Sequence, residues 1–174
     1  MSRAPFLIAT LNAAVHDRSR FNSASPALNC YLREQATQDI RRRVAACFVA
    51  LGDDLRIVGY YTLSSASVPL PDLPVEVQRI LPRYMAVPAV RTGRLAVDVD
   101  FQNQGLGSSL LINALRRATE AEIPATVLMV DAKDEQAAAF YRRHDFIPLA
   151  NSPLTLFLPL ATARSFILKN TDEP

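Results

Sequence analysis

The segment from Asp98 to Ser109, DVDFQNQGLGSS, has the residue types of an anion-binding turn. It joins a strand-like stretch to an amphipathic helix, and the first turn of a helix carries unpaired backbone N–H groups and the positive end of the helix dipole. Glycines at positions 105 and 107 let that backbone come close to a ligand. The neighbouring side chains are neutral donors, so main-chain amides would supply most of the affinity. The segment therefore predicts a site for a phosphate group.

Two common phosphate motifs do not fit this segment. A dinucleotide fingerprint would need a glycine where Leu110 stands, and a P-loop would need a Gly-Lys-Ser/Thr sequence. Residues 102–107, QNQGLG, instead match the Q/R-x-x-G-x-G/A pyrophosphate loop of the GNAT acetyltransferases, and the strand-like stretch GRLAVD precedes them at 93–98. Residues 140–146, FYRRHDF, resemble the F-Y-x-x-x-G-F segment that ends the last helix of that fold. Asp145 stands where the family usually has glycine, and a left-handed aspartate would accommodate the turn at a modest energetic cost.

The resemblance to GNAT enzymes implies a fold, a cosubstrate and a binding site. The fold is of the α/β class, with a mixed, mostly antiparallel central sheet flanked by helices, in a single GNAT domain over residues 1–174. The cosubstrate is acetyl-CoA, whose pantetheine arm would lie along the strand backbone and whose thioester oxygen would accept an N–H from it. The residues that the resemblance assigns to cofactor binding are Leu95, Ala96, Val97, Gln102, Asn103, Gln104, Gly105, Leu106, Gly107, Ser108, Ser109 and Phe140.

Tyr141 is the residue that we assign to catalysis, because the family's tyrosine in this segment reaches the acetyl-CoA sulfur. A thiol leaves with a pKa of about 8.5 and a tyrosine keeps its proton to about pH 10, so Tyr141 can protonate the sulfur at neutral pH. The alternative is a buried tyrosine that closes the core beside Phe140. An acetyltransferase also needs an amine that accepts the acetyl group. An α-amino group has a pKa of roughly 8, so as an acceptor it needs no strong base. Candidate proton relays, none of which is assigned, are Asp98, Asp100, Asp131 and His144.

Further blocks resemble one branch of the family, the GNAT toxins of type II toxin–antitoxin systems, which acetylate the amino group of charged tRNA and block translation. The blocks are HDRSRFN at 16–22, LNCYL at 28–32, VGYYTL at 58–63, GRLAVD at 93–98, VDA at 130–132 and FY at 140–141. The resemblance implies an aminoacyl-tRNA substrate, an antitoxin of the ribbon-helix-helix type and a homodimer. The alternatives are a GNAT N-acetyltransferase of a small-molecule amine or a protein N-terminus, and a non-enzymatic CoA-binding or interaction module.

The basic residues are of a kind that suits phosphate. Of the 19 basic residues 17 are arginine, a planar side chain that binds phosphate through two parallel hydrogen bonds, although the net charge is only +2. Phosphate contacts would make RNA binding steeply dependent on salt. The alternative is that these arginines lie on solvated faces. The arginines that we assign to RNA binding are Arg33, Arg41, Arg42, Arg43, Arg91, Arg142 and Arg143.

Hydrophobic periodicity predicts the elements that must position these residues. The Ser25-Pro26 pair predicts the start of a helix that ends at the arginine run 41–43, and residues 44–63 predict an antiparallel hairpin. Five prolines between residues 68 and 88 predict a connecting or lid-like insert. The later elements are strands at 90–99, 126–131, 146–149 and 154–158 and helices at 105–122 and 134–143, and the tail at 161–168 is an interface or a cap.

The composition excludes several classes of protein. A chain of 174 residues that is 49% apolar and 21% charged predicts one folded domain with a real core. Cys30 and Cys47 have no metal-ligand spacing, so we expect free thiols and no metal. The sequence has no apolar run of about 18 residues and no secretory pattern at its start, so we expect no membrane partner and a cytoplasmic protein.

Overall fold

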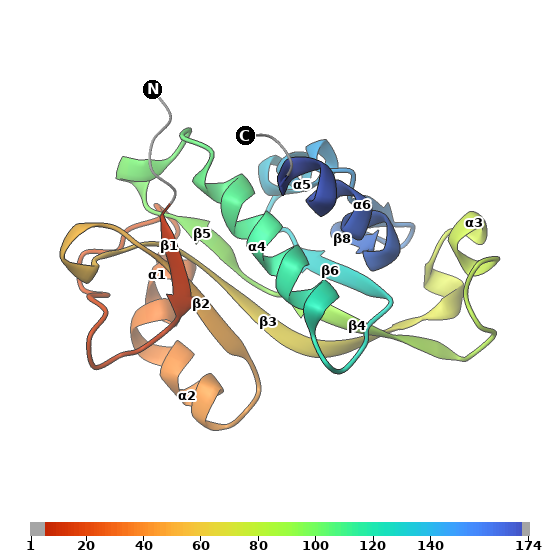
Figure 1. Cartoon of the computed structure of the whole chain (residues 1–174), viewed down its shortest axis with the longest axis horizontal. Coiled ribbons are helices and arrows are strands. Elements are labelled where there is room, and N and C mark those ends of the chain that lie inside the picture. The colour runs from red at the N-terminus through yellow and green to blue at the C-terminus, as the bar shows by residue number, and fades with distance from the viewer. Residues whose placement is uncertain (1–5, 172–174) are drawn as a thin grey trace. The chain divides into compact units, whose positions relative to one another are not determined.

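The computed structural model describes residues 6–171 (Figure 1). These residues form two compact units. The first unit holds the described residues up to 64 together with residues 94–114, and the second holds residues 65–93 and the described residues from 115 onward. Strand β3 (Ile57–Pro69) and helix α4 (Leu106–Glu120) begin in the first unit and end in the second. Within residues 6–171, every helix is too short or too polar to span a bilayer.

The sheet of the first unit pairs its strands in antiparallel fashion. β1 (Leu7–Thr10) pairs with β2 (Ala46–Leu51), β2 with the first part of β3, and β3 with β5 (Leu95–Val97). The predicted hairpin at 44–63 is confirmed, with the short 3-10 helix η2 (Asp53–Leu55) in its turn. The sequence pattern does not predict β1, because a strand of four residues is too short to show a clear alternation.

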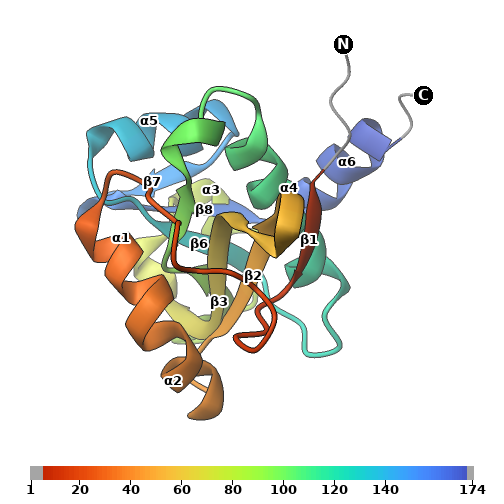
Figure 2. The same cartoon turned by 90° about the vertical axis from the view of Figure 1, so that its left-hand side faces the viewer.

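A helical segment of three parts lies against β2 and β3 in this unit (Figure 2). It consists of α1 (Pro26–Cys30), the π-helical turn η1 (Tyr31–Gln35) and α2 (Ala36–Arg41). The predicted N-cap is confirmed, because the Ser25 side chain accepts a hydrogen bond from the Leu28 N–H at 3.4 Å. The predicted helix is therefore present, but a π-turn that the sequence pattern does not indicate interrupts it.

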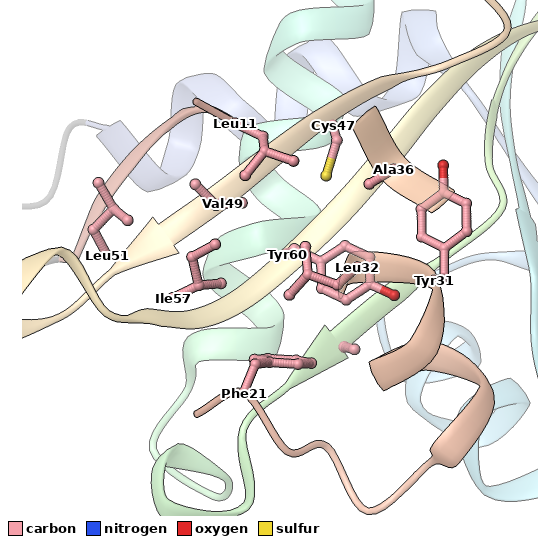
Figure 3. Packing of buried hydrophobic residues seen from close by; sticks show 11 residues of the cluster. Leu11, Phe21, Tyr31, Leu32, Ala36, Cys47, Val49, Leu51, Ile57 and Tyr60 are labelled. Atoms are coloured by element: carbon pink, nitrogen blue, oxygen red, sulfur yellow. The ribbon is translucent and has the colours of Figure 1, made fainter. Parts of the chain in front are cut away.

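The core of the first unit lies between this helical segment and the sheet. Tyr31 and Leu32 are buried against Val49, Ile57 and Tyr60, and Figure 3 shows their side chains converging between the two layers. The buried residues of this cluster are Leu11, Phe21, Tyr31, Leu32, Ala36, Cys47, Val49, Leu51, Ile57, Tyr60 and Ala96.

Helix α4 packs closely on β3 because Gly59 has no side chain. A Cβ at position 59 would lie 3.0 Å from Leu110 Cδ1 and 3.2 Å from the Ala96 carbonyl oxygen. Leu106 and Leu110 are buried, as the predicted amphipathic pattern requires. Alanine at position 59 would force the start of α4 away from the sheet.

The predicted strand at 90–99 is wrong as a single element. The structure has two strands there, β4 (Ala86–Thr92) and β5, separated by Gly93 and Arg94. β4 pairs in parallel with β6 (Val127–Asp131), whereas β5 pairs in antiparallel fashion with β3. Two different partners cannot be read from a local hydrophobic run, which explains the error.

In the second unit, the strand order that starts from the end of β3 is β3-β4-β6-β8-β7. β8 (Ser152–Pro159) pairs in antiparallel fashion with both β6 and β7 (Ile147–Leu149). The predicted helix at 134–143 is confirmed as α5 (Glu135–Arg143), and the tail, for which we predict only an interface or a cap, forms α6 (Leu160–Thr171). With its parallel β4–β6 pair among antiparallel pairs, the chain has the predicted mixed α/β class.

The proline-rich insert also belongs to the second unit. It contains the 3-10 helix η3 (Leu70–Asp72) and the single-turn helix α3 (Val75–Gln78). Val68 and Leu73 fix its base in a hydrophobic cluster of this unit, whose other buried members are Val87, Ala89, Val127, Met129, Leu149 and Phe157. The insert is thus a connection with short helical turns, as the prolines predict.

Candidate active site

The loop between β5 and α4 is built around left-handed residues. The 3-10 helix η4 (Val99–Phe101) follows β5, and then Asn103 has a φ of 60° and Gly105 a φ of 81°. A Cβ at Gly105 would meet no atom within 4 Å, so glycine is required there by the backbone angle and not by crowding. The place that a side chain would occupy at Gly105 is therefore open, and the backbone there is accessible from outside.

The start of α4 presents amide groups at this loop. Its first hydrogen bond runs from the Ser109 N–H to the Gly105 carbonyl at 3.0 Å, so the amides of Leu106 and Gly107 have no acceptor within the helix. The Leu106 side chain is buried, so only its backbone can take part in ligand binding. Open space, amide donors and the positive end of the helix dipole fit a diphosphate such as that of coenzyme A.

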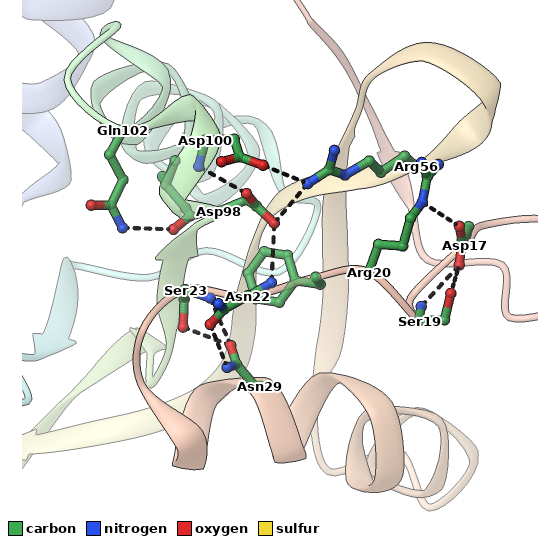
Figure 4. Close-up of polar contacts among 12 residues, drawn as sticks. Asp17, Ser19, Arg20, Asn22, Ser23, Asn29, Arg56, Asp98, Asp100 and Gln102 are labelled. Atoms are coloured by element: carbon green, nitrogen blue, oxygen red, sulfur yellow. Dashed lines mark hydrogen bonds and ion pairs between the residues drawn. The ribbon is translucent and has the colours of Figure 1, made fainter.

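A network around Asp98 fixes the start of the loop (Figure 4). The Asp98 carboxylate is buried and accepts hydrogen bonds from the Asn22 and Asp100 N–H groups, each at 3.0 Å. The Arg56 guanidinium donates to Asp98 at 3.2 Å and to Asp100 at 3.3 Å, and it lies 5.4 Å from the Phe101 ring centroid. These contacts explain both aspartates as structural residues that hold the end of β5 and the following turn in place.

The two remaining relay candidates also have structural partners. Asp131 pairs with Arg91 at 3.4 Å, and His144 Nδ1 lies 2.9 Å from the Phe140 carbonyl oxygen. Each of the four candidate proton relays thus has contacts of a structural kind.

One edge of β5 is open, and alternation decides which residues face it. The Thr62 N–H donates to the Arg94 carbonyl at 3.0 Å and the Asp98 N–H donates to the Val58 carbonyl at 2.9 Å, so even-numbered residues face β3. The backbone groups of Leu95 and Val97 therefore point to the other edge, where β5 has no partner among the described strands. The Val97 carbonyl accepts a hydrogen bond from Gln102 Nε2 at 3.0 Å. The N–H groups of Leu95 and Val97, rather than that of Ala96, remain for a ligand.

Tyr141 lies in the second unit, near the end of α5. Asp134 caps the helix by accepting the Ala137 N–H at 2.8 Å, and the Tyr141 ring packs against Phe140 at 5.2 Å and Phe146 at 5.7 Å between centroids. The residue is 4% exposed, and its hydroxyl has no hydrogen-bond partner within residues 6–171. Burial, with a smaller contribution from the charge of Asp131, raises the pKa of the Tyr141 hydroxyl above its usual value. The group therefore stays protonated at neutral pH.

The turn after α5 has the predicted left-handed aspartate. Asp145 has a φ of 68°, and the Phe146 N–H returns to the Tyr141 carbonyl at 3.2 Å. Asp145 thus takes the left-handed conformation that ends this helix, at the position where the family usually has glycine. Phe140, which we predict to bind the cofactor, contacts the His144 ring at 4.7 Å between centroids in the same turn.

The arginines assigned to RNA binding are divided between the units. Arg33, Arg41, Arg42 and Arg43 lie in the first unit, and Arg91, Arg142 and Arg143 lie in the second. The run at 41–43 is exposed at the end of α2, where cations suit the helix dipole. Arg33 donates to the Asn29 and Phe21 carbonyls, Arg91 pairs with Asp131, and Arg142 pairs with Glu135. A phosphate would therefore have to compete with carboxylates at Arg91 and Arg142.

Sequence reasoning did not single out the contact of Arg94 with Tyr31. Its guanidinium carbon lies 3.6 Å from the centroid of the Tyr31 ring, in the first unit and directly before β5. Both residues belong to blocks of the toxin resemblance, GRLAVD and LNCYL, which was the available signal. The two residues are 63 positions apart in the sequence, so their contact depends on the fold. Within residues 6–171, no group of three or more His, Cys, Asp or Glu is arranged to hold a metal ion.

Residues 44–148 match the family model of the acetyltransferase (GNAT) domain, a range that includes both β5 with its loop and α5 with Tyr141. The chain belongs to the GNAT acetyltransferase family. It is therefore an acetyltransferase, and the predicted resemblance and fold are confirmed.

Curated relatives of this GNAT enzyme include toxins. The chain is 39% identical over 153 residues to the tRNA-acetylating toxin of Mycobacterium tuberculosis, which covers 87% of this chain and 90% of that protein. It is 27% identical over 171 residues to the probable toxin TacT of Sinorhizobium fredii, covering 92% of this chain and 94% of that protein.

Solved structures of similar fold are also toxins. A tyrosine-to-phenylalanine mutant of KacT has a TM-score of 0.87 at 31% identity and covers 94% of this chain and 99% of its own. AtaT complexed with acetyl-methionyl-tRNAfMet has a TM-score of 0.85 at 28% identity, over 92% and 98% of the two chains. A mutant AtaT bound to the C-terminus of the antitoxin AtaR and acetyl-CoA has a TM-score of 0.79 at 25% identity, over 94% and 98%.

Proposed function

We propose that this GNAT enzyme transfers the acetyl group of acetyl-CoA to the α-amino group of aminoacyl-tRNA and so blocks translation, with residues 1–174 acting as one GNAT domain. The observation that carries the proposal is the open edge of β5 leading into the amide-rich start of α4, in a chain that is 39% identical to a tRNA-acetylating toxin. The likeness to AtaT in complex with an acetylated aminoacyl-tRNA supports the same substrate class.

The first unit would hold acetyl-CoA, which supplies the acetyl group as a thioester when bound. The amides of Leu106 and Gly107 would bind the diphosphate, with the neutral side chains of the loop as further donors. The N–H groups of Leu95 and Val97 would bind the pantetheine arm and the thioester oxygen. Asp98 and Arg56 would position both segments without touching the ligand.

Tyr141 would act as the general acid. Its hydroxyl holds a proton at neutral pH because burial raises its pKa, and it has no hydrogen-bond partner of its own within residues 6–171. It would donate that proton to the departing thiolate sulfur. The acceptor α-amino group has a pKa of roughly 8 and is partly neutral near pH 7, so no dedicated base is required.

The two thiols support direct transfer over an acyl-enzyme route. A hydrogen bond to the Glu34 carboxylate raises the pKa of the exposed Cys30 thiol, and burial raises the pKa of the Cys47 thiol to about 12. A nucleophilic cysteine needs the opposite shift, since the thiolate is the reactive form. We therefore propose attack of the substrate amine on the thioester in one step.

We further propose that arginines bind the RNA and that an antitoxin of the ribbon-helix-helix type neutralises a homodimeric enzyme in the cytoplasm. The exposed run at 41–43 supports the RNA contact, and the structure of AtaT with the C-terminus of AtaR supports an antitoxin partner. Arg143 is also exposed and lies close in sequence to Tyr141.

The experiment is a transfer assay with radiolabelled acetyl-CoA and four acceptors: charged tRNA, uncharged tRNA, free amino acids and peptides with a free N-terminus. We expect label only on charged tRNA, in a product that releases N-acetyl amino acid when the ester is hydrolysed. Label on free amines or peptides with none on charged tRNA would reject the proposal and favour the small-molecule or N-terminal alternative. Gly105→Val is the control, since it should abolish transfer to every acceptor.

A further inference from the structure

Arg94 holds its side chain against an aromatic face at the start of β5. Its guanidinium carbon lies 3.6 Å above the Tyr31 ring centroid, well inside the roughly 6 Å range of a cation–π contact. Its backbone is fixed as well, because the Arg94 carbonyl accepts the Thr62 N–H at 3.0 Å. Both ends of the residue are therefore constrained within the first unit.

The Tyr31 ring is itself held rigidly. It is 3% exposed, its hydroxyl donates to Asp39 Oδ2 at 2.9 Å, and it stacks on Tyr60 with centroids 6.3 Å apart and planes 14° apart. The Tyr60 hydroxyl donates to the Leu28 carbonyl at 2.7 Å. Figure 3 shows the two rings side by side between the helical segment and the sheet. Tyr31 also begins the π-turn η1, a feature that recurs at functional sites.

The guanidinium in this contact has no polar partner. Within residues 6–171, Arg94 makes no side-chain hydrogen bond and no ion pair, although it is only partly exposed. Two other partly buried arginines of the same unit have polar partners: Arg18 donates to the Leu32 and Arg33 carbonyls, and the Arg56 Nη2 group donates to two carboxylates, although the Arg56 Nε has no partner within residues 6–171. A stacked guanidinium keeps its edge N–H groups available, and a cation without partners in a partly desolvated place is suited to an anion.

The positive charge of Arg94 affects the pKa values of neighbouring side chains. It lowers the pKa values of Tyr31, Tyr60 and Cys47, against the larger effect of burial, which raises all three. The groups on which Arg94 acts are thus two buried tyrosines and a buried thiol, and the Asp39 carboxylate accepts the hydrogen bond of the Tyr31 hydroxyl.

Arg94 is also one residue from the backbone groups proposed to bind the thioester. A strand rises about 3.3 Å per residue, so the Arg94 side chain leaves the backbone within about 10 Å of the amides of Leu95 and Val97. Aminoacyl-tRNA carries its amine on the ester of the 3′-terminal adenosine, and the anion nearest to that amine is the phosphate that joins this adenosine to the preceding nucleotide. Arginine binds such a phosphate through two parallel hydrogen bonds.

We propose that Arg94, stacked on Tyr31, binds the phosphate that precedes the 3′-terminal adenosine of the aminoacyl-tRNA acceptor. This inference rests on the proposed function and names the part of the substrate that the first unit recognises. Every tRNA has this phosphate and free amino acids lack it. Arg94 therefore separates RNA-linked amines from free ones and leaves the choice among different tRNAs to other residues.

The experiment compares two acceptors that differ only by this phosphate: an aminoacyl ester of adenosine and the same ester of the dinucleotide CpA. The wild-type enzyme should acetylate the CpA ester with a kcat/KM at least about tenfold higher, the size expected of one charge-assisted contact. Arg94→Gln should abolish that advantage, lowering kcat/KM on the CpA ester about tenfold and on the adenosine ester by less than about twofold. The KM for acetyl-CoA should not change in either case.

Two further variants separate the phosphate contact from charge and packing. Arg94→Lys keeps the charge but loses the planar fork and the stack, so its penalty on the CpA ester should lie between those of wild type and Arg94→Gln. Arg20→Gln is the matched control, because Arg20 is exposed, pairs with Asp17 and carries the same charge. It should leave both acceptors within about twofold of wild type.

Each outcome decides the inference. Equal losses on both acceptors, or a lowered melting temperature with unchanged kcat/KM, would assign Arg94 a packing role and overturn the phosphate contact. Equal kcat/KM of the wild-type enzyme on the two acceptors would overturn it without any variant. If the wild-type enzyme acetylates neither ester nor charged tRNA, the proposed function itself fails and the inference fails with it.

Discussion

Replacing Tyr141 with phenylalanine should separate catalysis from folding. The ring contacts with Phe140 and Phe146 remain in the variant, and the hydroxyl has no hydrogen-bond partner to lose within residues 6–171. We therefore expect the free energy of unfolding to change by less than about 0.5 kcal/mol. Loss of a general acid lowers a rate by roughly 10²–10⁴-fold, so kcat should fall at least about 100-fold. The KM for acetyl-CoA should stay nearly unchanged, because the phenol acts on the leaving sulfur.

Tyr61→Phe is the matched control, with the opposite pattern. Tyr61 is also buried, but its hydroxyl donates to Asn113 Oδ1 at 2.5 Å. Removing one partner of a buried hydrogen bond costs about 1–3 kcal/mol, which lowers the melting temperature by roughly 2–4 °C per kcal/mol in a chain of this size. Activity of the folded Tyr61→Phe enzyme should remain within about threefold of wild type. Initial rates of labelled acetyl transfer and thermal melts measure both effects.

The pH dependence of the wild-type enzyme adds a second readout. Burial raises the pKa of Tyr141 above the usual value of about 10, so its ionisation should cause no loss of activity below pH 10. The acceptor amine has a pKa of roughly 8, so kcat/KM should rise with pH and level off above that value. Wild-type turnover by Tyr141→Phe with an unchanged melt, or a descending limb below pH 9 in initial rates, would refute the general-acid role.

Three further predictions follow from the first unit. Gly105→Val should weaken the binding of coenzyme A at least about tenfold, as measured by isothermal titration. A β-branched residue is strained by roughly 1–2 kcal/mol at a φ of 81°, and its side chain would enter the space proposed for the ligand. Wild-type affinity would contradict the proposed role of the loop. Asp98→Ala should lower the free energy of unfolding by about 3–5 kcal/mol in urea melts, because it leaves two backbone N–H groups and Arg56 without their buried acceptor. A loss below about 1 kcal/mol would contradict the structural role of the Asp98 network. The free energy of unfolding should fall as pH rises from about 9 toward 12, because the unfolded chain releases the Cys47 proton while burial keeps the folded pKa of Cys47 at about 12. Cys47→Ala should reduce this slope of the free energy of unfolding against pH by up to about 1.4 kcal/mol per pH unit. An unchanged slope would contradict the role of Cys47.

Local chemistry in the sequence was sufficient for the elements that carry the loop and the phenol. The Ser25 N-cap, the hairpin at 44–63, the start of α4 at the glycines and the end of α5 at Asp145 were all predictable. Each depends on groups within a few residues of one another: a capping oxygen, a turn, a left-handed backbone angle or a repeating apolar stripe. The motif pair that identifies the family has the same local character.

Pairing between distant segments was not predictable in the same way. The single strand expected at 90–99 is two strands in the structure, because β4 pairs with β6 and β5 pairs with β3. The edge strand β1 and the helix α6 have weak patterns of their own and owe their structure to the strands beside them. A hydrophobic run records that a segment is buried but not which partner buries it.

The amino-acid sequence by itself identified the family and predicted the phosphate loop and the catalytic phenol, because these predictions depend on short motifs whose geometry is set by neighbouring residues. Only the tertiary structure decided that Leu95 and Val97, rather than Ala96, present free amides. Backbone N–H groups alternate between the two edges of β5, so the free ones can be assigned only when the edge that pairs with β3 is known. The tertiary structure alone also placed Arg94 on Tyr31, a contact made when a helical turn packs on a strand far along the chain.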